Sequence, residues 1–177
     1  MTFRLFSAIP VLAAMSSGCS FSFDADLPEV EITQRGLTVP GVPQTTAASD
    51  LSVTSSFTLS SSDTAWAKDM NSDVLVHQVK IVASGSLPNL DFIQLARMTV
   101  AAPSISGAAT DIMDYERGEE APSSSVIEVS MSAPVDITTP WSADNTIIEV
   151  QIAGQLPGQD WTVDVTLTLS GKITYKF

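Results

Sequence analysis

The sequence predicts an all-β protein built as an antiparallel sandwich of about eight strands, and three observations lead to that prediction. Hydrophobic residues make up 44% of the 177 residues and charged residues only 16%, so Ser and Thr supply much of the polar surface. Hydroxylated residues suit the outer faces of strands, whereas exposed helix faces usually carry Glu, Lys and Arg. Several segments alternate apolar and polar residues with a period of two, and clusters of Pro, Gly, Asn and Asp separate them.

The clearest alternation lies in residues 161–177. One parity of this segment is apolar from Trp161 to Phe177, and the other carries mainly Thr, Ser and Lys. A period of two places all the apolar side chains on one face of a strand, and a helix would scatter them. Gly171 is the only gap on the apolar face, which predicts a bend or bulge there.

Seven further segments have strand-like patterns. In 74–84 the parity slips at His77 and Gln78, which predicts a β-bulge. A helical turn is expected within residues 62–70, with Ser62 or Asp63 as its N-cap. An immunoglobulin-like or similar sandwich accommodates this number of short strands. The expected strands are 29–35, 51–60, 74–84, 96–102, 110–115, 125–131 and 146–153.

An internal echo accompanies the strands. Residues 84–92 (SGSLPNLDF) resemble residues 153–161 (AGQLPGQDW), and each segment follows one apolar strand and precedes another. Upstream of them, TAWAKD at 64–69 resembles TPWSAD at 139–144. Two readings remain open: a duplication that gives two related halves, or repeated use of one good turn sequence. In both, Pro presets the turn and Asp accepts hydrogen bonds from neighbouring backbone N–H groups.

The N-terminus has the pattern of a secretory signal peptide. Arg4 supplies the positive charge, and the apolar run Leu5–Met15 is shorter than the roughly 20 residues that a membrane-spanning helix needs. The segment Met15-Ser16-Ser17-Gly18-Cys19 then resembles the lipobox of bacterial lipoproteins. In that family the leader is cut before the Cys, which becomes the acylated first residue.

This resemblance implies a division of the chain. Residues 1–18 are the expected lipoprotein signal peptide, 19–27 a short tether and 28–177 a single β-sandwich domain. Several acyl chains on Cys19 would make membrane attachment permanent, at about 0.8 kcal/mol per buried CH₂. Ser20, in place of an Asp after the Cys, implies transport to the outer membrane in this family; Ser16 departs from the Leu that is commonest at its position.

The charge of the chain limits its partners. With 20 acidic and 8 basic residues, the formal net charge is −12, so nucleic acid and anionic headgroups are not expected to bind through a general field. The expected partners are the membrane, through the lipid, and other envelope proteins or glycans. A single Cys allows no intramolecular disulfide.

No catalytic signature stands out, and the chain is expected not to be an enzyme. The single Cys is assigned to lipidation, and the single His, His77, sits in an apolar strand and is expected at an edge or bulge. A Ser–His pair at His77 is uninformative at this stage because Ser is abundant along the whole chain. No cofactor is expected apart from Ca²⁺.

Two groups of residues are the candidate ligand sites. One is a set of carboxylates around Arg117 and Gly118 whose oxygens suit Ca²⁺, with a solvated acidic loop as the alternative. The other is a surface platform for glycan or peptide formed by Trp66 and Trp141, with burial in the core as the alternative. The carboxylates are Asp111, Asp114, Glu116, Glu119 and Glu120.

These observations together lead to one functional hypothesis and two rivals. The leading hypothesis is a non-catalytic, membrane-anchored envelope lipoprotein that acts as a structural or binding module. The first rival is a ligand-binding module for Ca²⁺ or for glycan or peptide, and the second is a hydrolase of unrecognised type.

Overall fold

A computed structural model describes residues 22–43, 51–59, 72–105, 107, 109–143 and 146–176. Within these ranges the chain forms eight strands and one four-residue helix. In chain order they are β1 (Ser22–Val39), β2 (Ser52–Leu59), β3 (Ser72–Ser84), β4 (Ile93–Ala101), β5 (Thr110–Glu116), β6 (Val126–Asp136), α1 (Thr138–Trp141), β7 (Thr146–Gly154) and β8 (Trp161–Lys176).

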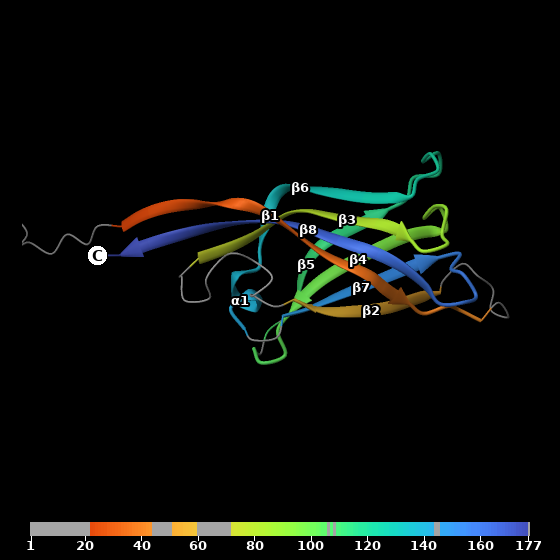
Figure 1. Cartoon of the computed structure of the whole chain (residues 1–177), viewed down its shortest axis with the longest axis horizontal. Coiled ribbons are helices and arrows are strands. Elements are labelled where there is room, and N and C mark those ends of the chain that lie inside the picture. Colours follow the sequence, from red (N-terminus) through yellow and green to blue (C-terminus); the bar gives the residue numbers. More distant parts are fainter. Residues whose placement is uncertain are drawn as a thin grey trace, which may run out of the picture.

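The strands form two four-stranded antiparallel sheets that pack face to face (Figure 1). Sheet A has the order β1-β8-β3-β6, and sheet B has the order β2-β7-β4-β5. The predicted antiparallel β-sandwich is therefore confirmed. The strand order is that of a jelly roll, an eight-stranded double sheet, rather than the four-plus-three arrangement of a constant-type immunoglobulin domain.

The core lies between the two sheets and follows the period-two pattern of the sequence. In β8 the residues of one parity, Trp161 to Leu169, are buried, and the intervening Thr, Asp and Ser residues are half-buried on the outer face. Ile148, Val150 and Ile152 of β7 fill the same layer from the opposite sheet. Complete burial of each such side chain stabilises the fold by roughly 1.5–3 kcal/mol.

The two echoed segments occupy equivalent places in the sandwich. The first joins β3 of sheet A to β4 of sheet B, and the second joins β7 of sheet B to β8 of sheet A. If β1 to β4 are renamed β5 to β8 in order, and β5 to β8 are renamed β1 to β4, sheet A takes the strand order of sheet B and sheet B that of sheet A. The set of neighbouring strand pairs therefore stays the same. The aromatic residues that end the two segments, Phe92 and Trp161, pack edge to face with ring centroids 5.0 Å apart. The same exchange of names holds for any jelly roll, so both readings of the echo stay open.

Of two predicted irregularities in sheet A, one is confirmed. The pairing of β3 with both β6 and β8 shifts register between Val76 and Gln78, which places the predicted bulge at His77. The bend or bulge predicted at Gly171 is not found in β8, which pairs through Gly171 with Leu27 and with Val74, and the register shift nearby lies in β1 between Leu27 and Val30. A Cβ atom at Gly171 would lie 2.8 Å from a methyl of Leu27, so the missing side chain leaves room for the side chain of the neighbouring strand. The helical turn expected at 62–70 lies outside the described residues.

The expected tether 19–27 is wrong from Ser22 onward. Residues 22–27 are the first part of β1 and pair with β8 from Ser22↔Lys176 to Leu27↔Gly171. From the sequence alone, this short segment after Cys19 is expected to be a spacer. The strand that pairs with it lies about 150 residues away, so nothing near it in the sequence indicates the pairing. In Figure 1 these ends of β1 and β8 run together beyond most of the other strands.

The helix α1 was also not foreseen. It occupies the connection from β6 to β7, where Val74 N–H donates to Thr138 Oγ1 at 2.8 Å and Ile137 N–H donates to the Val74 carbonyl at 2.9 Å. Its four residues give too short a window for helical periodicity to register. No helix in the described part of the chain is long and apolar enough to span a bilayer.

Candidate functional site

The outer face of sheet B holds a shallow depression of about 330 Å³. Strand register builds it: Arg97 of β4 lies opposite Asp114 of β5 on one side and opposite Gln151 of β7 on the other. Leu95, two residues along β4, lies on the same face and is 48% exposed. The lining residues are Ser52, Leu95, Ala96, Arg97, Asp114, Gln151 and Ala153.

The charged side chains of this depression are exposed. A guanidinium nitrogen of Arg97 lies 3.6 Å from a carboxylate oxygen of Asp114, and the two side chains are 56% and 74% exposed. Exposed ion pairs of this kind contribute little to stability, typically 0.2–1 kcal/mol. Arg97 donates, Asp114 accepts, and the Gln151 amide can do both. Next to the aliphatic surface of Leu95, this set suits a ligand with hydroxyl groups and an apolar patch.

The structure disperses the carboxylates that the sequence suggested as a calcium site. Asp111 and Asp114 belong to β5 and lie opposite Thr99 and Arg97, while Glu119 and Glu120 follow in the next connection. All of these side chains and that of Glu116 are exposed. Among the described residues, no three His, Cys, Asp or Glu side chains gather in a way that could hold a metal ion. The calcium hypothesis is therefore corrected in favour of a solvated acidic surface.

The proposed tryptophan platform is also not present as expected. Trp141 ends α1, is only 8% exposed and belongs to the hydrophobic core. A ring buried to this extent offers no face to a sugar or peptide. Trp66 lies outside the described residues, as does the expected lipidation site Cys19.

His77 forms a Ser–His contact on the outer side of sheet A. Its Nε2 atom hydrogen-bonds to Ser170 Oγ of β8 across the bulge of β3. Among the described residues, no carboxylate hydrogen-bonds to the other ring nitrogen, the role that a carboxylate has in a catalytic triad. The described geometry is thus that of a cross-strand polar contact that fills the bulge.

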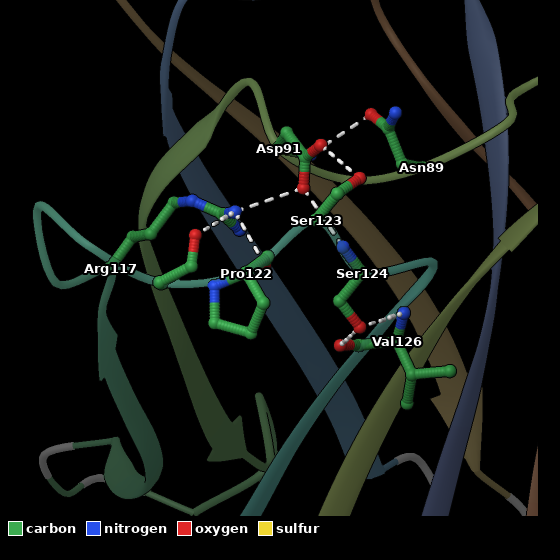
Figure 2. A network of polar contacts seen from close by, with 8 residues as sticks. Asn89, Asp91, Arg117, Pro122, Ser123, Ser124 and Val126 are labelled. Atoms are coloured by element: carbon green, nitrogen blue, oxygen red, sulfur yellow. Dashed lines mark hydrogen bonds and ion pairs between the residues drawn. The ribbon is translucent and has the colours of Figure 1, made fainter.

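A second polar network closes the end of the sandwich where the echoed segments lie (Figure 2). Arg117, whose side chain is 10% exposed, donates to Asp91 Oδ1 at 2.9 Å and to the carbonyl oxygens of Ala121 and Pro122. Asp91 also accepts from Ser123 Oγ at 2.5 Å and from Ser124 N–H at 3.0 Å. The network joins the β3–β4 connection to the β5–β6 connection.

These hydrogen bonds act on the charge of Asp91. The hydrogen bonds from the Ser123 hydroxyl and then from the Ser124 backbone N–H lower the pKa of Asp91 below its ordinary value; burial opposes them, and the guanidinium of Arg117 lowers the pKa further. Asp160, at the matching place in the other echoed segment, accepts from Gly41 N–H at 2.9 Å. Both Asp residues therefore fasten a loop that is distant in sequence, whereas the sequence predicted bonds to backbone N–H groups of their own turn.

Reasoning from the sequence missed the depression itself. Arg97, Asp114 and Gln151 come from three strands, and no spacing along the chain brings them together. The available signal was the alternation in β4, which predicts that Leu95 and Arg97 share a face. Asp114 was singled out as a metal ligand, whereas its cross-strand neighbour is a cation.

No protein-family model and no curated protein matches the sequence. Among solved structures, the chain is similar to the decameric BFDV capsid protein, at 11% identity and a TM-score of 0.39 over 86% of this chain and 99% of that chain. It is also similar to the family 32 carbohydrate-binding module of C. perfringens NanJ, solved in complex with galactose, at 12% identity and a TM-score of 0.33 over 82% and 99%. At these values no function passes from those proteins to this chain.

The fold and the depression define the class to which the chain can be assigned. It is a jelly-roll β-sandwich whose sheet B has a shallow polar depression on its outer face.

Proposed function

We propose that the protein is a non-catalytic lipoprotein of the bacterial outer membrane that binds envelope glycans through the outer face of sheet B. The observation that carries the binding role is the depression formed by Arg97, Asp114 and Gln151 beside the exposed Leu95. Sugars present hydroxyl groups that donate and accept hydrogen bonds, together with an apolar C–H surface. The depression offers hydrogen-bonding side chains for the hydroxyl groups and the exposed side chain of Leu95 for the C–H surface.

The anchoring role rests on the lipobox resemblance at Cys19. Only Ser20 and Phe21 stand between Cys19 and the first residue of β1. At about 3.3–3.6 Å per residue, the chain from Cys19 to Ser22 can reach roughly 10 Å. The projecting end of β1 and β8 would then face the bilayer. The depression, near the start of β2 and the end of β7, would lie toward the opposite end of the sandwich.

Replacement of Cys19 by Ala is expected to abolish lipidation and membrane attachment. Cells that express the full chain and grow with radiolabelled palmitate should yield a labelled protein in the membrane fraction. The C19A variant should carry no label and leave that fraction, because the acyl chains are the proposed anchor. A wild-type product that carries no palmitate would disprove the anchor and leave the binding role to be judged separately.

Replacement of Arg97 by Ala is expected to weaken glycan binding by about 10- to 100-fold, since a hydrogen bond to a charged group contributes about 1.5–3 kcal/mol. Sedimentation with purified peptidoglycan and with lipopolysaccharide measures the binding. Glu128→Ala is the matched control, because Glu128 is an exposed charged residue on sheet A. Equal losses for both variants, or no binding by the wild type to either polymer, would refute the proposed face.

A further inference from the structure

Three of the four edge strands carry features that prevent pairing with another chain. An edge strand exposes unpaired N–H and C=O groups, and proteins protect such edges with Pro, bulges and charges. In sheet A, β1 contains Pro28 and shifts register twice, and β6 contains the exposed Pro134 and loses its pairing with β3 near it. In sheet B, β5 carries Asp111, Asp114 and Glu116 along a register shift.

The fourth edge strand, β2, has none of these features. Its pairing with β7 runs without a break from Ser52↔Ala153 to Leu59↔Thr146. Its sequence, SVTSSFTL, contains no Pro, no Gly and no charged residue. Within the described part of the chain, β7 is the only strand that pairs with β2.

The register identifies the backbone groups that point away from β7. Gly154 N–H donates to the Leu51 carbonyl at 3.4 Å, so these two residues form a hydrogen-bonded pair. Such pairs recur at every second residue of an antiparallel ladder, so the backbone N–H and C=O groups of the odd-numbered residues of β2 point toward β7. The N–H and C=O groups of the even residues then point to the open edge. These residues, Ser52, Thr54, Ser56 and Thr58, also have exposed side chains on the outer face.

We propose that β2 pairs with β2 of a second copy of this chain, antiparallel and across a two-fold axis at Ser55. In this register Ser52 lies opposite Thr58 and Thr54 lies opposite Ser56, so every outward backbone group finds a partner. Cross-strand Ser and Thr pairs are favourable on the outer face. The two B sheets become one continuous sheet.

Three properties of the molecule select a second copy as the partner. The strand is self-complementary in the register above, and on the inner side Leu51 and Val53, which are only partly buried, come opposite Leu59 and Phe57. A chain of net charge −12 repels its copies over most of its surface, while β2 itself is uncharged. Because the other edges are protected, pairing through β2 closes as a dimer and does not grow into a fibre.

Disulfide trapping in membranes tests the pairing in the full chain. Directly opposite residues of an antiparallel pair are close enough for a disulfide. The double variant Thr54→Cys/Ser56→Cys should therefore yield a disulfide-linked dimer as the main product after mild oxidation, read on a non-reducing gel. The matched control is Asp114→Cys/Glu116→Cys on the protected edge β5 of the same sheet. The unmodified chain gives the baseline.

A second measurement does not depend on cysteines. Thr54→Pro removes an outward N–H and leaves the pairing with β7 intact, whereas Thr54→Val keeps that N–H. In detergent, sedimentation should give the mass of two protein chains for the wild type and for Thr54→Val, and of one chain for Thr54→Pro with an unchanged far-ultraviolet spectrum. A monomeric wild type, or equal trapping at β2 and β5, would overturn the proposal, as would trapping of β2 to a different protein.

Discussion

Replacement of Gly154 by Ala should lower the free energy of unfolding by roughly 3 kcal/mol or more, through steric overlap and backbone strain. Gly154 ends β7 with a φ of 146°, a region that residues with a side chain rarely adopt. A Cβ atom there would lie 2.1 Å from the Phe92 carbonyl oxygen and 2.8 Å from Gln94 N. Both neighbours are backbone atoms, Phe92 at the end of the β3–β4 connection and Gln94 in β4, so neither can move aside without disturbing the pairing of β4 with β7.

Denaturant unfolding followed by far-ultraviolet circular dichroism measures this loss. The matched control is Gly118→Ala, because a Cβ atom at Gly118 would meet nothing within 4 Å. That variant should stay within about 0.5 kcal/mol of the wild type. A Gly154→Ala protein as stable as the Gly118→Ala protein would show that the turn after β7 does not pack as described.

Replacement of Trp161 by Ala should cost about 3–5 kcal/mol of stability, the usual loss when a buried large aromatic residue is truncated. Trp161 is 6% exposed and begins β8 at the place where the two echoed segments meet. Its ring lies edge to face with Phe92, a contact worth about 0.5–1.5 kcal/mol beyond the area it buries. Its loss therefore opens a cavity between the two halves of the sandwich.

Trp161→Phe distinguishes packing from hydrogen bonding. The indole Nε1 of Trp161 is buried and has no hydrogen-bond partner among the described residues. Phe keeps most of the ring contact and removes that unpaired donor, so we expect a loss below about 1.5 kcal/mol. Thermal and denaturant unfolding of the two variants provide the comparison. Similar losses for Ala and Phe would mean that an unseen partner of the indole N–H, rather than packing, holds the residue.

Much of the fold could be predicted because a period of two is a local property of a strand. Each of the eight expected segments overlaps one of the described strands, and the bulge at His77 was visible as a slip of parity. That Asp91 and Asp160 accept backbone hydrogen bonds was expected, but the donors, Ser124 and Gly41, lie far away in the sequence and not in the same turn. The first six residues of β1 were missed because their partner strand is the last one in the chain.

The candidate site was less predictable than the fold. Trp141 was considered for a surface platform because its context resembled a turn, and the packing of α1 turned it into a core residue. Arg117 stands among acidic neighbours in the sequence, yet it pairs with Asp91 from another connection. Which of two side chains close in sequence is exposed depends on what the rest of the chain places over it.

By itself, the sequence determined the all-β class, the approximate position of each strand, the face of β8 that is buried, and the lipobox pattern at Cys19. Only the tertiary structure decided the jelly-roll order of the strands, the meeting of Phe92 with Trp161, the depression around Arg97 and the place of β2 at the end of sheet B. The physical reason is that alternation assigns a side chain to a face of a strand but does not choose the neighbouring strand. That choice is made by long-range packing of all the strands together.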